Sequence, residues 1–264
     1  MPMSRPESPN FRSTLTRTLF FILLSGLSYA SIAQKSMRDS SLSFAMLSPS
    51  YTLMIPSADL NARFGVFSGI GADLSYKFKS NFILFGNLSF LFGNRVKETS
   101  MLDYLKNEEG QILDVNGRIG DLIFEQRGLY GHIDLSRNIV KLGPNPNCGL
   151  YFGLGFGFLQ HRIKVRELAG NFPAIDAEYN KGYDRLSSGP LMNQSLYYRF
   201  FSNDRILNFY FGIEAFQAFT NGRRSYQFDT KMPYNESRVD LAYGLRAGWT
   251  FPIYKRAPRQ FYYE

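Results

Sequence analysis

The chain has 264 residues, a formal net charge of +8 and one cysteine, Cys148. A single cysteine excludes an intramolecular disulfide and a cysteine zinc cluster. The positive charge comes without a basic helix or recognition motif, so nucleic acid is not an expected partner. Aromatic residues make up 16% of the sequence and glycine is abundant, at 23 residues, which together favour a β protein.

Residues 1–33 have the pattern of a secretory signal peptide. Three arginines precede an apolar stretch that runs from Leu19 to Ile32, and Ala33 supplies a small residue at the cleavage position. The apolar stretch is short for a transmembrane helix. We therefore expect an exported protein whose mature chain begins near Gln34.

Eight later segments show the period-two alternation of β-strands. In the clearest segment, Phe152, Leu154 and Phe156 share one face with Cys148, while glycines occupy the other face. A change of parity at Pro49 predicts a bulge in the first segment, and the second segment places Phe64 outward. The expected strands cover about Leu42–Ile55, Arg63–Phe78, Phe82–Arg95, Gly128–Leu142, Cys148–Lys164, Ser188–Phe201, Ile206–Phe219 and Val239–Tyr254.

Short connectors and long polar segments alternate between these strands. The short ones are 79–81, 143–147 and 202–205, and the longest polar segment, Val96–Arg127, contains a possible hairpin around Ile112-Leu113. Short periplasmic turns and long outer loops are typical of outer-membrane barrels. The sequence therefore predicts an all-β, eight-stranded antiparallel up-and-down transmembrane barrel over residues 34–254, with a periplasmic tail over 255–264.

An eight-stranded barrel encloses a space that side chains just fill. The alternation places charges of both signs inside it, which predicts a salt-bridged, filled lumen rather than an open pore because buried charges need partners. The expected lumen network consists of Asp73, Lys77, Asp134, Glu214, Asp240 and Arg246.

Two outer loops combine charged and aromatic residues, a composition that suits a docking surface for a partner. The alternative is that Asp184 and Asp229 pair with nearby arginines and stiffen the loops. The docking candidates are Lys181, Tyr183, Asp184, Arg185, Arg223, Arg224 and Asp229.

A lipid-modifying enzyme is a further alternative, since some small barrels use Ser and His near the outer rim. His161 is expected at that rim, with Ser187, Ser188 or Ser195 on the neighbouring strand. No spacing fixes a nucleophile, a base and an orienting acid together, so we expect no catalytic residues. The two histidines form no ligand cluster, and neither a metal nor a cofactor is expected.

Several stretches of the mature chain carry a resemblance to a known family. They are Pro144–Gly149, Gln160–Ile163, Lys181–Leu186, Asn208–Tyr210, Arg223-Arg224 with Phe228-Asp229, and Gly248 through Pro252 and Tyr254. The chain resembles small outer-membrane barrels of OmpA-like size, including the PorG-like group found alongside the type IX secretion system. The resemblance implies a non-catalytic scaffold subunit of an outer-membrane secretion or protein-assembly machine, with protein partners in the envelope. A stand-alone envelope-stabilising or adhesive barrel remains the alternative.

Overall fold

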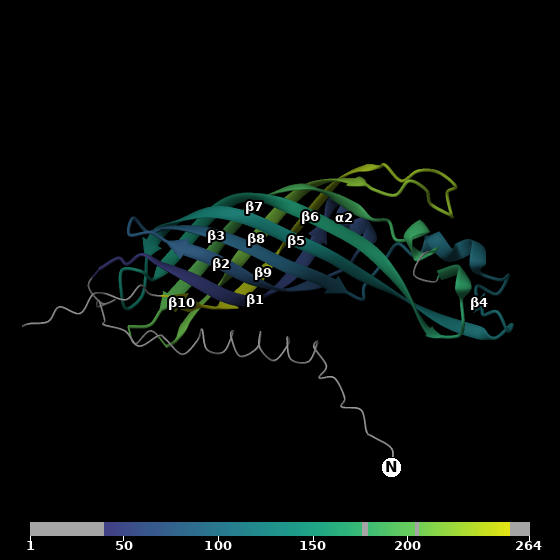
Figure 1. Cartoon of the computed structure of the whole chain (residues 1–264), viewed down its shortest axis with the longest axis horizontal. Helices are drawn as coiled ribbons and strands as arrows, with labels where there is room; N and C mark the ends of the chain where they lie inside the picture. The colour runs from purple at the N-terminus through teal and green to yellow at the C-terminus, as the bar shows by residue number, and fades with distance from the viewer. Residues whose placement is uncertain (1–39, 176–178, 204–205, 254–264) are drawn as a thin grey trace, which may run out of the picture. The chain divides into compact units, whose positions relative to one another are not determined.

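The computed structural model describes residues 40–175, 179–203 and 206–253, which Figure 1 shows as a barrel of strands. The expected signal peptide (residues 1–33) and tail (255–264) lie outside the described residues. In chain order the elements are β1 (Phe44–Ser57), α2 (Ala58–Arg63), β2 (Phe67–Lys77), β3 (Phe82–Gly93), η1 (Ser100–Leu105), β4 (Ile112–Leu113), β5 (Ile119–Lys141), β6 (Gly149–Ala169), η2 (Pro173–Ile175), η3 (Tyr179–Gly182), β7 (Ser187–Phe201), β8 (Asn208–Gly222), β9 (Ser237–Trp249) and β10 (Phe251–Ile253).

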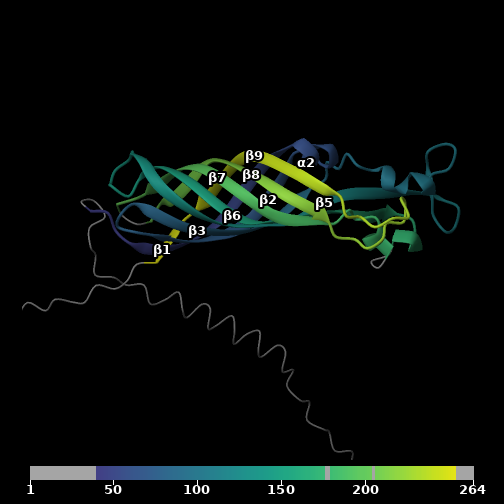
Figure 2. The ribbon, with the colours of Figure 1, turned by 90° about the horizontal axis from the view of Figure 1, so that it is seen from above.

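The barrel is a closed antiparallel ring. Each barrel strand pairs with the next one along the chain, and the ring closes where β1 pairs with β9. β10 continues the register of β9 along β1, with Ser50 opposite Gly248 and Leu47 opposite Phe251, so the two form one strand interrupted at Thr250. The ring thus has eight strands, which confirms the predicted fold class. The strands cross the barrel obliquely (Figures 1 and 2), as closure of a sheet requires.

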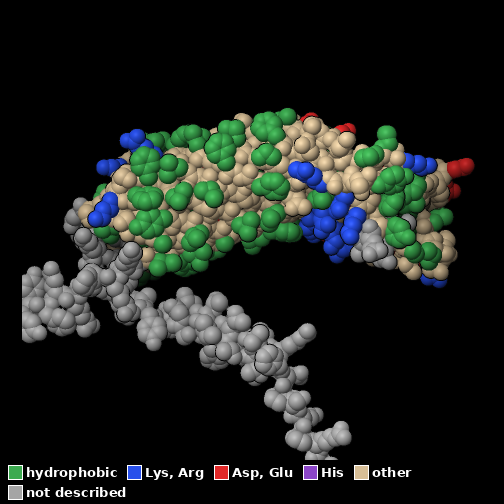
Figure 3. All heavy atoms as spheres, turned by 45° about the horizontal axis from the view of Figure 1, so that its top comes forward, with side chains coloured by type: hydrophobic (Ala, Val, Ile, Leu, Met, Phe, Trp, Pro, Cys, Tyr) green, Lys and Arg blue, Asp and Glu red, His purple; other side chains and the backbone are tan. Residues whose placement is uncertain are grey.

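The strands alternate between a buried interior and an apolar exterior. On β6, Phe152, Leu154 and Phe156 are 43%, 54% and 69% exposed, while Tyr151 and Gly153 are buried. Figure 3 shows apolar side chains spread over the barrel surface. So large an exposed apolar surface is a liability in water, whereas in a bilayer it faces acyl chains. The exterior is therefore the lipid-facing surface.

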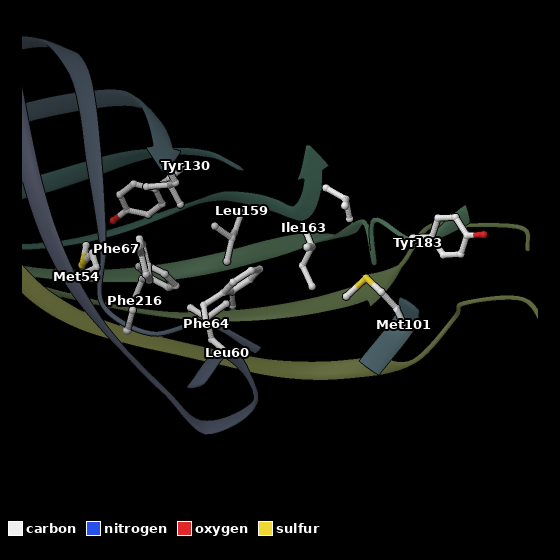
Figure 4. Close-up of a cluster of buried hydrophobic side chains, with 14 of the residues drawn as sticks. Met54, Leu60, Phe64, Phe67, Met101, Tyr130, Leu159, Ile163, Tyr183 and Phe216 are labelled. Atoms are coloured by element: carbon white, nitrogen blue, oxygen red, sulfur yellow. The ribbon is translucent and has the colours of Figure 1, made fainter. Parts of the chain in front are cut away.

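Apolar side chains fill the outer part of the lumen. This outer cluster combines side chains of the barrel strands with Leu60 of α2 and with Met101 and Tyr183 of the outer loops (Figure 4). No helix among the described residues is long and apolar enough to cross a membrane. Residues of the outer cluster include Met54, Leu60, Phe64, Phe67, Leu91, Met101, Tyr130, Leu159, Ile163, Tyr183 and Phe216.

A second apolar cluster fills the lumen near the short turns, and the two clusters together show why two predictions fail. Phe44 and Met46 belong to this inner cluster, so β1 keeps one regular register through Pro49 and has no bulge. Phe64, expected to face lipid, is fully buried and packs edge-on against His161, with ring centroids 5.4 Å apart. Both ends of the lumen are thus closed by apolar side chains that alternation alone assigns to lipid.

Cys148 was also expected to face lipid, and this prediction is wrong. The residue is fully buried, and its Sγ accepts a hydrogen bond from the Phe201 backbone N–H at 3.2 Å. Gly149 follows with a φ of +144°, a conformation that side chains other than glycine rarely adopt. This turn places Cys148 inside the barrel before the alternation of β6 begins.

The predicted outer loops contain more regular structure than expected. β5 and β6 are 23 and 21 residues long, so part of the expected loop Val96–Arg127 is strand, and the two strands extend beyond the ring toward β4 in Figure 1. β4 pairs with Ile119-Gly120, which confirms the small hairpin. The expected loop Pro56–Ala62 forms the end of β1 and most of α2.

Glycines on the two faces of the ring should differ sharply in tolerance. A Cβ at Gly155, which faces the lumen, would overlap the Asp134 carboxylate and the Ile133 carbonyl, whereas at outward Gly86 its nearest neighbour is the Leu74 carbonyl at 3.6 Å. We expect Gly155→Ala to lower the free energy of unfolding by about 1–3 kcal/mol through overpacking. Gly86→Ala is the matched control and should change it by less than about 0.5 kcal/mol. Urea titration in detergent measures both values, and equal losses would contradict this account.

Candidate functional site

Arg246 is the centre of a buried charge network in the lumen. Its guanidinium lies 3.2 Å from Asp73 and 3.1 Å from Glu214. Asn87 donates to Asp73 at 2.6 Å and accepts from Arg246 at 3.3 Å. The charged side chains are at most 2% exposed. One cation between two carboxylates offsets much of the cost of burying them.

Tyrosines complete this network. The Tyr197 hydroxyl donates to Glu214, the Tyr210 hydroxyl donates to Asp73, and Ser50 donates to Asp73 at 3.2 Å. Neutral donors stabilise the two carboxylates without adding charge. The network joins strands on opposite sides of the ring.

The other expected lumen carboxylates pair with histidines. Asp134 lies 2.7 Å from His132 Nδ1 and accepts from Asn193 at 2.8 Å. Asp240 lies 2.9 Å from His161 Nε2. Both pairs are buried inside the barrel, and no ion pair or hydrogen bond within the described residues joins Asp134 or Asp240 directly to Arg246.

Lys77 lies apart from the other predicted lumen charges, at the end of the barrel that carries the short turns. Its ammonium donates to Ser41 Oγ at 3.0 Å, the Leu42 carbonyl at 3.2 Å and Asn81 Oδ1 at 2.9 Å. Lys77 therefore ties the segment before β1 to the turn between β2 and β3. Of the six expected network residues, the structure brings together Asp73, Glu214 and Arg246.

Sequence reasoning missed a further lumen cation, Arg199. It is 1% exposed, and its guanidinium carbon lies 4.7 Å from the ring centroid of Tyr210 and 5.2 Å from that of Phe85. Aromatic faces attract a cation in this geometry. Its inward parity with Tyr197 on β7 is the signal that would have found it.

All four outer loops meet at one ion-pair node, which we name the four-loop clamp (Arg63, Glu98, Arg185, Asp229 and Tyr234). Glu98 accepts from Arg63 Nε at 2.7 Å and from Arg185 Nε at 2.9 Å. Arg185 Nη1 donates to Asp229 at 3.1 Å, and Arg63 Nη2 donates to the Tyr234 hydroxyl at 2.6 Å. The clamp thus joins the four outer loops to one another at the outer end of the barrel.

The charges of the clamp stabilise one another. Burial alone would raise the pKa of Glu98, but the adjacent Arg63 and Arg185 outweigh it and hold that pKa below its ordinary value. Burial alone would lower the pKa of Arg63, but Glu98 and Tyr234 raise it. The clamp is thus stable in its charged form. Glu98 stands in the long charged insertion, where no sequence pattern distinguishes it.

Most of the docking candidates are engaged within the molecule. Arg185 and Asp229 belong to the clamp, and Arg224 Nε donates to Asp184 at 2.8 Å. Tyr183 is 4% exposed and hydrogen-bonds Tyr104. These contacts match the alternative in which the acids pair with nearby arginines and stiffen the loops.

The two remaining candidates, Lys181 and Arg223, are exposed at the outer rim. Arg223 Nε donates to Ser188 Oγ at 2.9 Å. In the part of the chain that the structure describes, neither cation forms an ion pair with a carboxylate. They are the predicted loop residues that present charge to the surroundings.

His161 and Ser187, cross-strand neighbours in the enzyme alternative, each bind other groups in the structure. His161 binds Asp240, whereas the Ser187 hydroxyl donates to the Arg185 carbonyl and accepts from Arg63, each at 3.1 Å. Both side chains are fully buried. Within residues 40–175, 179–203 and 206–253, no group of three or more His, Cys, Asp or Glu is arranged to hold a metal ion.

Two amide side chains interrupt the lipid-facing surface of β7 and β8. Gln194 pairs across the strands with Ala215, and Gln217 pairs with Met192, so the two glutamines are diagonal neighbours. The structure gives neither side chain a hydrogen bond within the described residues. Beside Gln194 and Ala215 lies an apolar groove of about 490 Å³, lined by Phe152 of β6 and by residues of β1, β7, β8 and β9. Acyl chains offer these two amides no hydrogen-bond partner, and an unsatisfied amide is costly in hydrocarbon.

The closed ring, the apolar exterior and the polar, filled lumen define a transmembrane β-barrel of the outer-membrane class. No protein-family model and no curated protein matches the chain. The type IX grouping therefore stays a prediction.

Solved structures with a similar arrangement are small outer-membrane barrels. The attachment invasion locus protein Ail of Yersinia pestis is 12% identical, covers 79% of this chain and 99% of its own, and gives a TM-score of 0.38. The N-terminal barrel of Pseudomonas aeruginosa OprF is 13% identical, with 80% and 100% covered and a TM-score of 0.36. Neisserial surface protein A is 11% identical, with 78% and 96% covered and a TM-score of 0.36.

Proposed function

We propose that this protein is a non-catalytic scaffold subunit of an outer-membrane secretion or protein-assembly machine, of the kind found with type IX secretion. Export through a cleaved signal peptide over residues 1–33 belongs to the same proposal. A filled lumen and clamped loops suit a structural role. The observation that carries the proposal of a partner is the pair Gln194 and Gln217 on the lipid-facing surface.

The two glutamines favour a protein partner inside the membrane. Each amide has two donors and an acceptor that acyl chains leave unsatisfied. A transmembrane segment with polar side chains would satisfy the amides and fill the groove beside Gln194. Such contacts hold membrane segments together where the hydrophobic effect does not.

Affinity purification after mild detergent extraction tests this proposal. We expect a co-eluting envelope protein in fixed stoichiometry with the barrel. Gln194→Leu/Gln217→Leu should reduce its yield at least fivefold, about 1 kcal/mol, since hydrogen bonds in membranes are worth roughly that much. Quantitative mass spectrometry measures the ratio.

Gln160→Leu is the matched control, because Gln160 also faces outward but lies farther toward the outer loops, opposite Ser188 near the start of β7. It should leave the co-eluting protein unchanged. A barrel that elutes alone would overturn the scaffold proposal. Equal losses in both variants would overturn the assignment of the contact to β7 and β8.

The outward hairpin favours a second candidate function, that of an adhesive barrel. Beyond the ring it exposes Leu113, Val115, Ile119 and Leu168, which are 44%, 61%, 62% and 65% exposed. Exposed apolar side chains on a projecting hairpin suit contact with another surface. Replacing residues 108–117 by a short Gly-Ser linker should then abolish cell attachment while leaving the purification partner in place.

A further inference from the structure

A group of basic side chains stands directly beyond the lipid-facing surface of β6. Phe156 and Phe158 lie on that face directly before Gln160, and Arg162 and Lys164 follow outward on the same face. At about 3.3 Å per residue, Arg162 lies roughly 13 Å along the strand from Phe158. Figure 3 shows Lys and Arg side chains gathered beside the apolar surface of the barrel. The position matches the headgroup layer of the outer leaflet.

These cations line a small pocket. Arg162, Lys164 and Lys181 contribute to its wall, together with Asn180 and Asp184, and its volume is about 160 Å³. That is room for several water molecules at about 30 Å³ each, and so for a phosphate group. Arg162 is about half exposed and available to a ligand.

The charge of the pocket is not neutralised by the described residues. Asp184, its one lining carboxylate, is held by two hydrogen bonds from Arg224 and lies 3.9 Å from Arg162. Lys164 and Lys181 form no ion pair within the described part of the chain. Asp176 and Glu178, in the same loop, lie outside the described residues.

We infer that this pocket binds the phosphate group of a phosphorylated glycolipid in the outer leaflet. Guanidinium and ammonium groups are the preferred side-chain partners of phosphate. Basic pockets beside a membrane surface are suited to anionic headgroups. The acyl chains of such a lipid would continue along Phe158 and Phe156, so one molecule would contact both the pocket and the apolar surface. This binding goes beyond the scaffold function proposed above and does not depend on it.

Binding of bisphosphorylated lipid A to the purified full chain in detergent micelles tests the inference. We expect saturable binding that Lys164→Gln/Lys181→Gln weakens about tenfold or more, as two lost surface cations would produce. Lys79→Gln/Lys141→Gln is the matched control, because it removes two exposed lysines at the opposite end of the barrel. It should retain the affinity of the unmodified chain. The heat-dependent mobility shift on electrophoresis verifies that every variant is folded.

Three further probes separate the possible sources of the anion. Dephosphorylated lipid A should bind at least tenfold more weakly, and inorganic phosphate and phosphatidylglycerol should compete poorly. Equal binding of dephosphorylated lipid A would show that acyl chains alone are recognised and would overturn the inference. So would equal binding of free phosphate or phosphatidylglycerol, or an equal loss in the control variant.

Discussion

Arg246→Met should lower the free energy of unfolding by about 3–5 kcal/mol, the cost of removing one partner from a buried ion pair. In the unmodified protein the Arg246 guanidinium lies 3.2 Å from Asp73 and 3.1 Å from Glu214. The substitution leaves both carboxylates buried without this cation. Water has no access to screen them, since each is at most 2% exposed. Urea unfolding in lipid vesicles, followed by the fluorescence of the single tryptophan, Trp249, measures the change.

Two variants separate the lost charge pairing from the lost side chain. Arg137→Met removes an exposed arginine whose guanidinium lies 5.4 Å from the ring centroid of Phe82 on the lipid-facing side, and it should cost less than about 1 kcal/mol. The triple variant Asp73→Asn/Glu214→Gln/Arg246→Met should recover most of the stability, because it buries no unpaired charge. A loss below about 1 kcal/mol for Arg246→Met alone would contradict the role of Arg246 as the centre of the network.

The barrel was predictable because lipid and lumen impose opposite chemistry on successive residues. Phe152, Leu154 and Phe156 on β6 follow this rule without exception. Parity likewise places Asp73 and Arg246 inside. Parity does not predict which of the inward charges form ion pairs, because that depends on the stagger between strands on opposite sides of the ring.

The failures have one physical cause. Alternation distinguishes apolar from polar faces, but the ends of this lumen are themselves apolar. The apolar residues buried at these ends include Phe44, Phe64 and Cys148. In the sequence, an apolar residue that fills the lumen cannot be distinguished from one that faces lipid. The four-loop clamp was unpredictable for a different reason: Arg63 and Glu98 are 35 positions apart, and loop conformation alone brings them together.

Glu98→Gln should loosen all four outer loops at neutral pH. The substitution removes the carboxylate that joins Arg63 to Arg185 and leaves both arginines without that partner in a closed site. Loss of hydrogen bonds to charged groups costs about 1–3 kcal/mol, so local opening should become about five- to 150-fold more frequent. Hydrogen exchange at the Arg223 and Phe228 amides, which bond Leu186 and Gly182 across loops, measures it.

The same carboxylate makes the loops sensitive to acid. The pKa of Glu98 is lower in the folded protein than its ordinary value, which is about 4.3 in an unfolded chain. The stabilisation is therefore complete above that value and is lost as the pH falls through the lower, folded pKa. Exchange corrected for its intrinsic pH dependence should rise below about pH 4 in the unmodified protein and stay level in Glu98→Gln. Glu236→Gln is the control, because it changes a loop carboxylate whose side chain is 70% exposed, and its exchange should respond to acid like that of the unmodified protein. If exchange in Glu98→Gln also rises below about pH 4, the acid response belongs to a group other than Glu98.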